Sequence, residues 1–241
     1  MRSDAKLIRT YWQVTRNSTF GLLLVLPLWL LYEVLAFQLN DGWLGELRTG
    51  TDLLVKYFLW KLDLNPGIGA VLILVAAAAF VLARREEVRE STRRPSFFGY
   101  AILESVVYAL LFGVVVGGVL ELFLSQGYSA RHPRVAALVM NLGAGVYEEL
   151  FFRLVLISAV VAALGKMTRW PERAQYALAV GLSAVLFASA HHLQVFQEPL
   201  NLRAWGFRFL AGVAFALLFI ARGVGIAAYT HSLYNVLLMF R

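Results

Sequence analysis

Residues 145–153 read GVYEELFFR and place three charged side chains, Glu148, Glu149 and Arg153, inside an apolar run that covers 135–165. A run of that length crosses a hydrocarbon core of about 30 Å. A charge at the centre of a membrane helix costs roughly 2.5–3.5 kcal/mol, whereas a leucine or phenylalanine returns only about 0.3–0.6 kcal/mol. The three charged groups are therefore predicted to face protein or a wet cavity and to avoid lipid.

The composition of the whole chain agrees with a membrane protein. Of its 241 residues, 60% are hydrophobic and 15% are charged, against about 45–50% and 25% in soluble domains. This balance excludes an ordinary soluble enzyme and a disordered protein. The chain has no cysteine, which excludes disulfides, thiolate zinc sites and a cysteine nucleophile. The net charge of +7 favours basic loops at anionic lipid headgroups over nucleic acid as a partner.

Apolar runs along the chain predict an all-α fold, a polytopic membrane bundle of about seven transmembrane helices. A shorter apolar stretch at 53–64 contains charges and predicts an interfacial or re-entrant helix. We expect a single integral membrane domain over 1–241, with the polar motifs in the half at about 135–241. The expected spans are 20–39, 67–83, 97–125, 135–165, 174–195, 205–221 and 224–240.

The distribution of basic residues predicts the orientation of this bundle. If the basic N-terminal segment 1–19 is cytoplasmic, the cytoplasmic segments hold 13 of the 22 Lys and Arg residues. Cytoplasmic loops carry such an excess. The apolar run that begins at residue 20 is too long for the core of a cleavable signal peptide. We therefore expect a multi-pass protein of the cell membrane with a cytoplasmic N-terminus.

Spacing assigns different tasks to the two glutamates. Glu149 and Arg153 are four residues apart, so they share a helix face and can pair. Glu148 has no such partner in its own helix and is a candidate base. The structural alternative is a buried ion pair that only fixes helix packing. Ionisable groups inside spans mark functional sites more often than not.

Two later apolar runs contain further polar groups, in FASAHH at 187–192 and HSLYN at 231–235. His231 and Asn235 are four residues apart and project from one helix face. An imidazole accepts or donates a proton, and an Asn amide supplies two N–H donors. Each group alone is also explained by a helix–helix hydrogen bond. Counting residues from the expected cytoplasmic ends puts Glu149 and His191 at similar depths and His231 lower.

Together these groups resemble the signature of the CPBP (Abi) family of intramembrane proteases, which includes the type II CAAX prenyl endopeptidases. The family pattern is E-E-x-x-x-R, then F-x-x-x-H, then H-x-x-x-N or D. All three motifs occur here in that order on separate apolar runs, within 141–235. The spacing from Phe187 selects His191, although His192 directly follows it and is an alternative.

The resemblance implies an all-helical membrane fold that hydrolyses peptide bonds inside a cavity open to one side. It implies that Glu148 activates water with help from His191, and that Glu149 and Arg153 support and orient it. His231 and Asn235 are implied as stabilisers of the oxyanion. The implied catalytic residues are Glu148, Glu149, Arg153, His191, His231 and Asn235.

The resemblance leaves the class of protease open between glutamic and metallo types. We favour the metal-free, glutamic type with no cofactor, while zinc held by Glu and His side chains stays possible. The expected partners are the lipid bilayer and a membrane-associated peptide or protein substrate, with the oligomeric state undetermined.

Two other functions compete with a protease. One is a non-catalytic immunity or scaffold membrane protein of the same fold that binds a peptide or a partner. The other is a proton-coupled transporter that uses the Glu and His groups as a relay. Transporters usually show repeated halves and broken helices, and this sequence shows neither.

Overall fold

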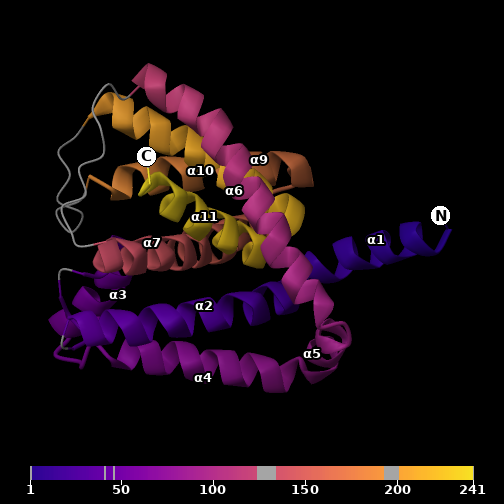
Figure 1. The fold of residues 1–241 in the computed structure, drawn as a ribbon, viewed down its shortest axis with the longest axis horizontal. Coiled ribbons are helices and arrows are strands. Elements are labelled where there is room, and N and C mark those ends of the chain that lie inside the picture. The colour runs from indigo at the N-terminus through magenta and orange to yellow at the C-terminus, as the bar shows by residue number, and fades with distance from the viewer. Residues whose placement is uncertain (1, 41, 46, 124–133, 193–200, 241) are drawn as a thin grey trace.

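A computed structural model describes residues 2–40, 42–45, 47–123, 134–192 and 201–240. Every regular element within these ranges is helical, which confirms the predicted all-α class (Figure 1). The helices are α1 Arg2–Thr15, α2 Ser18–Leu39, α3 Gly50–Lys61, α4 Ile68–Ala83, α5 Arg85–Thr92, α6 Ser96–Phe123, α7 Arg134–Glu148, the π-helix η1 Glu149–Ile157, α8 Ser158–Met167, α9 Glu172–Ala190, α10 Leu202–Arg222 and α11 Val224–Leu238.

Among the described residues, five helical segments are long and apolar enough to cross a membrane. They are α2, α9, α10, the part Ser96–Val115 of α6, and the continuous run Arg134–Met167. A sixth is added if α4 and α5, which meet at an 87° bend, count as one broken span. The sequence predicted about seven spans, and the difference includes α11, whose 15 residues reach only about 22 Å. The ends of the expected spans 97–125 and 174–195 lie outside the described residues.

The non-spanning helix predicted near 53–64 is present as α3, which begins three residues earlier. Thr49 caps its N-terminus by accepting a hydrogen bond from the backbone N–H of Asp52, the usual role of a threonine at this position. The charged residues Asp52 and Lys56 are each only 1% exposed. The polar face of this helix therefore packs inward, and its apolar side chains, such as Phe58 at 65% exposure, point outward.

Helix α11 lies at the centre of the bundle, where it packs against α2, α6, α7 and α10. Glycines allow two of these close approaches. A Cβ on Gly145 of α7 would lie 2.2 Å from Oγ of Ser232, and a Cβ on Gly225 would lie 2.9 Å from Cα of Gly21. Small residues at helix contacts are typical of membrane bundles. The central position of α11 brings its polar residues next to α7.

The turn between α10 and α11 is buried inside the bundle. Gly223 has φ +83°, a conformation that favours glycine, and a Cβ there would lie 3.2 Å from the carbonyl oxygen of Arg16. Arg222 donates to both carboxylate oxygens of Glu104, at 2.6 and 2.7 Å. Glu104 lies eight residues into α6, about two helical turns. Helix α11 therefore begins at a turn that the junction of α1 and α2 and the helix α6 cover.

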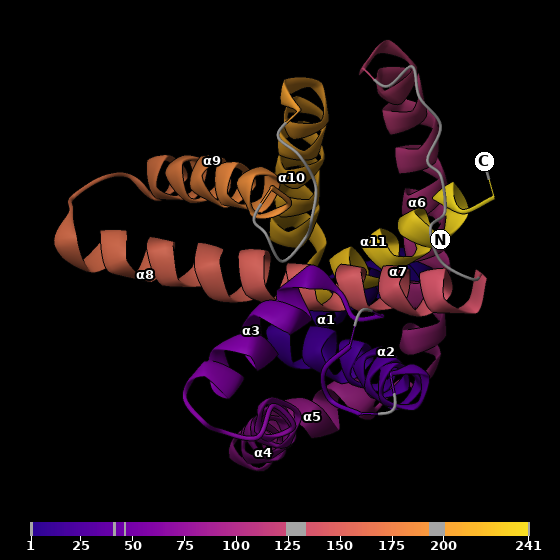
Figure 2. The same cartoon turned by 90° about the vertical axis from the view of Figure 1, so that its left-hand side faces the viewer.

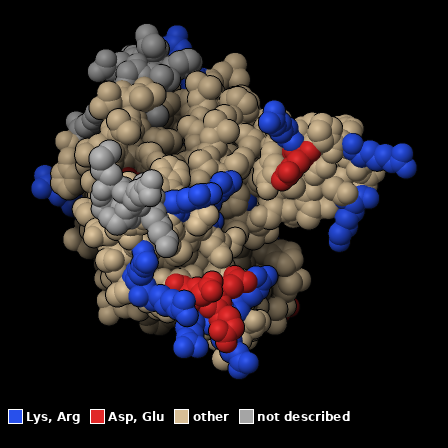
Figure 3. All heavy atoms as spheres, turned by 90° about the vertical axis from the view of Figure 1, so that its right-hand side faces the viewer, with Lys and Arg blue, Asp and Glu red and all other residues tan. Residues whose placement is uncertain are grey.

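Helices α1 and α5 lie at the same end of the molecule (Figure 1). Viewed from that end, charged side chains gather in separate patches on an otherwise uncharged surface (Figure 3). The patch over α5 mixes arginines with glutamates, as its sequence REEVREST requires. This is the end that the count of basic residues predicts to face the cytoplasm.

Candidate active site

The EExxxR motif lies where the long helix changes its winding. Helices α7 and α8 form one continuous rod (Figure 2), and the π-helix η1, Glu149–Ile157, lies between them. π-Helical turns are rare and occur frequently at functional sites. Ser183 of α9 donates to the carbonyl oxygen of Phe152 at 2.8 Å, which supplies a partner to this widened part of the backbone. No motif in the sequence indicates this change in winding.

Glu149 and Arg153 form the pair that their spacing predicts. Nε of Arg153 lies 3.3 Å from Oε2 of Glu149, and both side chains are fully buried. Arg153 also donates to the carbonyl oxygen of Gly212 at 3.5 Å, and its guanidinium lies 4.4 Å from the ring centroid of Phe187. The second oxygen of Glu149 lies 2.8 Å from Nδ1 of His231. Glu149 thus links the arginine to a histidine of α11.

Glu148 faces two histidines that come from different helices. Its Oε1 lies 4.0 Å from Nε2 of His191, at the C-terminal end of α9. Its Oε2 lies 3.8 Å from Nε2 of His231, on α11. The carboxylate is 4% exposed. Depth counting placed His231 lower than Glu149, whereas the structure brings the two side chains into contact.

Hydrogen bonds at the other ring nitrogens set the protonation of the two histidines. Nδ1 of His191 lies 2.8 Å from the carbonyl oxygen of Phe187, and Nδ1 of His231 lies 2.8 Å from Glu149. A carbonyl and a carboxylate only accept, so each Nδ1 carries the hydrogen. In a neutral ring Nε2 is then an acceptor. Three acceptors therefore converge near one point, an arrangement that suits a water molecule between them.

The motif F-x-x-x-H has a physical explanation in this geometry. The carbonyl of Phe187 is four residues before His191, so the helix itself fixes the histidine tautomer. The ring of Phe187 also meets the His191 ring edge to face, with centroids 5.0 Å apart. On the other side, Phe215 stacks on His231 with centroids 4.3 Å apart. Aromatic rings therefore exclude water around the polar groups.

The same three side chains are the natural candidates for zinc, and their chemistry suits it. Glu and His are zinc ligands, and a ligating His usually donates its other N–H to a carbonyl or carboxylate. Two ligands of a tetrahedral zinc ion lie about 3.4 Å apart, given bonds of roughly 2.0–2.1 Å. Glu148 is further than this from both histidines. In the part of the chain that the structure describes, no group of three His, Asp or Glu side chains is placed to hold a metal ion.

Three further polar residues lie on or directly after α9, α10 and α11, namely Asn235, His192 and Arg208. Asn235 lies one turn after His231 and is half-buried, and within the described residues no side-chain hydrogen bond or ion pair joins it to the Glu148 cluster. His192 has two buried ring nitrogens without a hydrogen-bond partner among the described residues, whereas Nε2 of His191 lies 4.0 Å from Glu148. Sequence reasoning missed Arg208 of α10, whose charge acts on Glu148 and His191. Its signal is an arginine within the apolar run 205–221.

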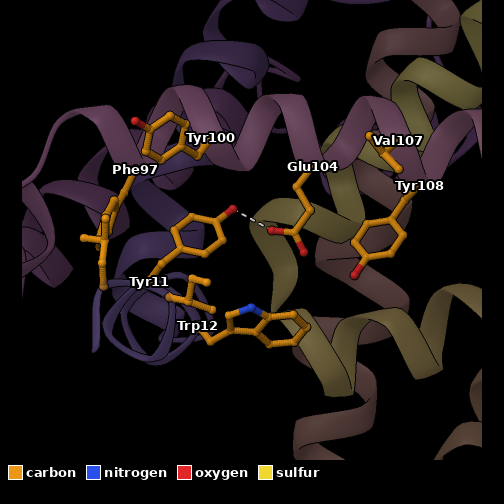
Figure 4. Close-up of a pocket in the computed structure, with 9 residues that line it drawn as sticks. Tyr11, Trp12, Phe97, Tyr100, Glu104, Val107 and Tyr108 are labelled. Atoms are coloured by element: carbon orange, nitrogen blue, oxygen red, sulfur yellow. Dashed lines mark hydrogen bonds between the residues drawn. The ribbon is translucent and has the colours of Figure 1, made fainter. Parts of the chain in front are cut away.

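A pocket of about 480 Å³ lies elsewhere, between α1 and α6. In it Tyr11 points toward Glu104 and donates to it at 2.5 Å (Figure 4). Glu104 is already neutralised by Arg222, and aromatic rings such as Trp12 and Phe97 line the rest. Burial and the neighbouring carboxylate raise the pKa of Tyr11. This pocket contains none of the motif residues and is not the candidate site.

Comparison with known proteins identifies the region that holds the motifs. Residues 130–237 match the family described as "Type II CAAX prenyl endopeptidase Rce1-like". No curated protein and no solved structure matches the chain. The matched segment contains all six candidate residues and lacks α1 to α6. Residues 130–237 therefore form a domain of the Rce1-like type II CAAX prenyl endopeptidase family, within the CPBP (Abi) group, and this family implies a CAAX-type protease.

Proposed function

We propose that this protein is a glutamic-type intramembrane endopeptidase that cleaves a peptide bond in a membrane-associated protein or peptide. The observation that carries the proposal is the position of the Glu148 carboxylate, 4.0 Å from Nε2 of His191 and 3.8 Å from Nε2 of His231. A water molecule between these groups has acceptors for its protons and is ready to attack a carbonyl carbon. The family match supports a proteolytic reaction.

Each polar group of the site has a separate role in the proposed reaction. In its ionised form Glu148 takes a proton from the water as the oxygen attacks, and the proton later passes to the leaving amine. His191 helps to hold the water. Glu149, anchored by Arg153, stabilises the positively charged form of His231, as a carboxylate does for the histidine of a catalytic triad. His231 reaches that form by taking up a proton from solvent, so that its Nε2 becomes a donor and stabilises the developing oxyanion.

Asn235 is proposed as the second donor to the oxyanion. Its side chain makes no hydrogen bond to the cluster in the described structure, so its donors are left for the substrate. We predict that Asn235→Ala lowers kcat by about 10²–10³, the usual cost of one oxyanion donor, while KM changes little. Steady-state kinetics with the purified protein measures both constants. Unchanged kcat would remove Asn235 from the mechanism, and a loss as large as that of a Glu148 variant would give it a larger role.

A metal-free mechanism makes a separate prediction. After thorough equilibration with a strong chelator, the purified protein is expected to keep its peptidase activity, because Glu148 and the histidines activate water without an ion. Activity with and without chelator, and after addition of zinc, is the measurement. Loss of activity in chelator that zinc restores would contradict this expectation, with Glu148, His191 and His231 as the first ligands to examine.

A further inference from the structure

A second group of buried charges lies beside the candidate site, outside the segment that matches the family. It consists of Glu33 on α2, Arg48 before α3, and Asp52 and Lys56 on α3, and we name it the N-terminal charge cluster. Glu33 is 7% exposed and the other three are each 1% exposed. Arg48 lies 3.1 Å from Glu33 and 2.8 Å from Asp52. Lys56 lies 3.0 Å from Glu33 and also pairs with Asp52.

The N-terminal charge cluster is balanced, because two carboxylates face two cations. The free energy lost when such charges leave water offsets much of their mutual attraction, and apolar residues often stabilise a fold equally well. The best-attested use of a buried ionic group is to fix the register of the elements around it. The cluster is therefore expected to fix the position of an element that packs against it.

The cluster is joined to α7 by Tyr147, the residue immediately before Glu148. The hydroxyl of Tyr147 donates to Glu33 and accepts from Nε1 of Trp29 at 3.1 Å. Nζ of Lys56 lies 5.7 Å from the centroid of the Tyr147 ring. Gly143, one turn earlier on α7, packs so closely that a Cβ there would lie 2.2 Å from the ring of Tyr32. One face of α7 is thus held against α2 and α3 (Figure 1).

The contact of Tyr147 with the cluster matters because Tyr147 directly precedes Glu148 on α7. Successive residues of an α-helix point about 100° apart, so the direction of Tyr147 also sets the direction of Glu148. A rotation of α7 by about 10° moves a group roughly 6 Å from the axis by about 1 Å. A displacement of about 1 Å at a reacting group costs on the order of 10² in rate. The π-helix begins at Glu149, directly after Glu148. The regular α-helical rotation per residue that links Tyr147 to Glu148 therefore does not continue beyond Glu148.

We infer that the N-terminal charge cluster, acting through the Tyr147 hydroxyl, fixes the rotation of α7 and so aims Glu148 at His191 and His231. Tyr147 is a positioning residue that does not touch the substrate. This inference rests on the proposed function, and it gives the first half of the chain a role in the chemistry of the second.

The test removes the hydroxyl alone, by Tyr147→Phe. We expect kcat to fall by about 10-fold or more with KM within about twofold of the wild type, because the substrate still binds while the base is misdirected. We also expect the pH profile of kcat to shift, since the surroundings of Glu148 change. A second measurement does not need activity: amide hydrogen exchange in 148–153 should become faster.

The chain offers a matched control in Tyr32→Phe. Tyr32 also donates to a carboxylate of the cluster, at 2.8 Å from Asp52, but this hydroxyl bond joins α2 to α3 and not to α7. The Phe ring of the variant keeps the packing of Tyr32 on Gly143 and Tyr147. This variant should lose thermal stability to a similar degree, speed up hydrogen exchange near 48–56, and keep kcat within about twofold. If Tyr147→Phe does not fold, Trp29→Phe takes its place, because it removes the donor to the Tyr147 hydroxyl and leaves Tyr147 intact.

The outcomes separate the inference from the proposed function. A wild-type protein without peptidase activity overturns the proposed function, while hydrogen exchange still reports on whether Tyr147 holds 148–153. Unchanged kcat and unchanged exchange in Tyr147→Phe overturn the positioning role. An equal loss of kcat in Tyr32→Phe overturns it as well, because the cluster would then act through general stability.

Discussion

Glu148→Gln is expected to lower peptidase activity by roughly four orders of magnitude or more, the scale seen when a group central to the chemistry is removed. The amide has nearly the shape of the carboxylate but cannot take a proton from water. Glu148 makes no ion pair closer than 3.8 Å, so the substitution breaks no strong contact and the fold should persist. The loss should therefore appear in kcat, with the yield and thermal unfolding of the detergent-solubilised protein close to those of the wild type.

The measurement compares the peptides released from membranes that contain the active protein or the Glu148→Gln variant. Glu90→Gln serves as the matched control, because Glu90 is an exposed carboxylate on α5 far from the motif and should leave activity unchanged. A fully active Glu148→Gln protein would end the protease proposal. It would favour the non-catalytic scaffold, which tolerates a near-isosteric change at this position.

The motif spacing predicted much of the candidate site because it describes local geometry. An interval of four residues places two side chains on one helix face whatever surrounds them. The pair of Glu149 with Arg153, and the choice of His191 over His192, follow from such intervals. The convergence of α7, α9 and α11 on Glu148 does not follow from intervals, since it depends on how the helices pack. The family resemblance supplied that part.

The sequence did not reveal the N-terminal charge cluster, although a signal was present. Arg48, Asp52 and Lys56 repeat at intervals of four and predict one charged helix face. The prediction of an interfacial or re-entrant helix at 53–64 gives this face no buried partner. The structure turns this face inward because Glu33, an isolated acid in an apolar span, needs buried partners. Only the tertiary arrangement brings these segments together.

The number of spans differed for a related reason. Hydropathy measures the length of an apolar run, and it assumes that each turn lies at the membrane surface. The turn at Arg222 and Gly223 is covered by protein, because Arg222 is buried and paired with Glu104. The arginine's charge predicted a surface loop, while its partner 118 residues earlier explains its burial.

The second large effect is expected for Arg153→Leu, which should damage folding as well as activity. The substitution leaves Glu149 buried with His231 as its remaining partner, and breaking a buried ion pair on one side costs about 3–5 kcal/mol. A typical domain has only about 5–15 kcal/mol of stability. Arg153→Lys should also be impaired, because a single ammonium group does not reach both Glu149 and the Gly212 carbonyl while lying over the ring of Phe187.

Thermal unfolding in detergent and peptidase kinetics measure the two effects separately. Arg203→Leu is the matched control, since Arg203 is exposed at the start of α10 and should change neither. The double variant Arg153→Leu with Glu149→Gln removes the orphaned charge and should recover part of the lost stability. It should not recover activity, because His231 then lacks the carboxylate that stabilises its charged form. Recovery of both would show that the pair serves packing alone, and no recovery of stability would show that Arg153 acts through contacts other than Glu149.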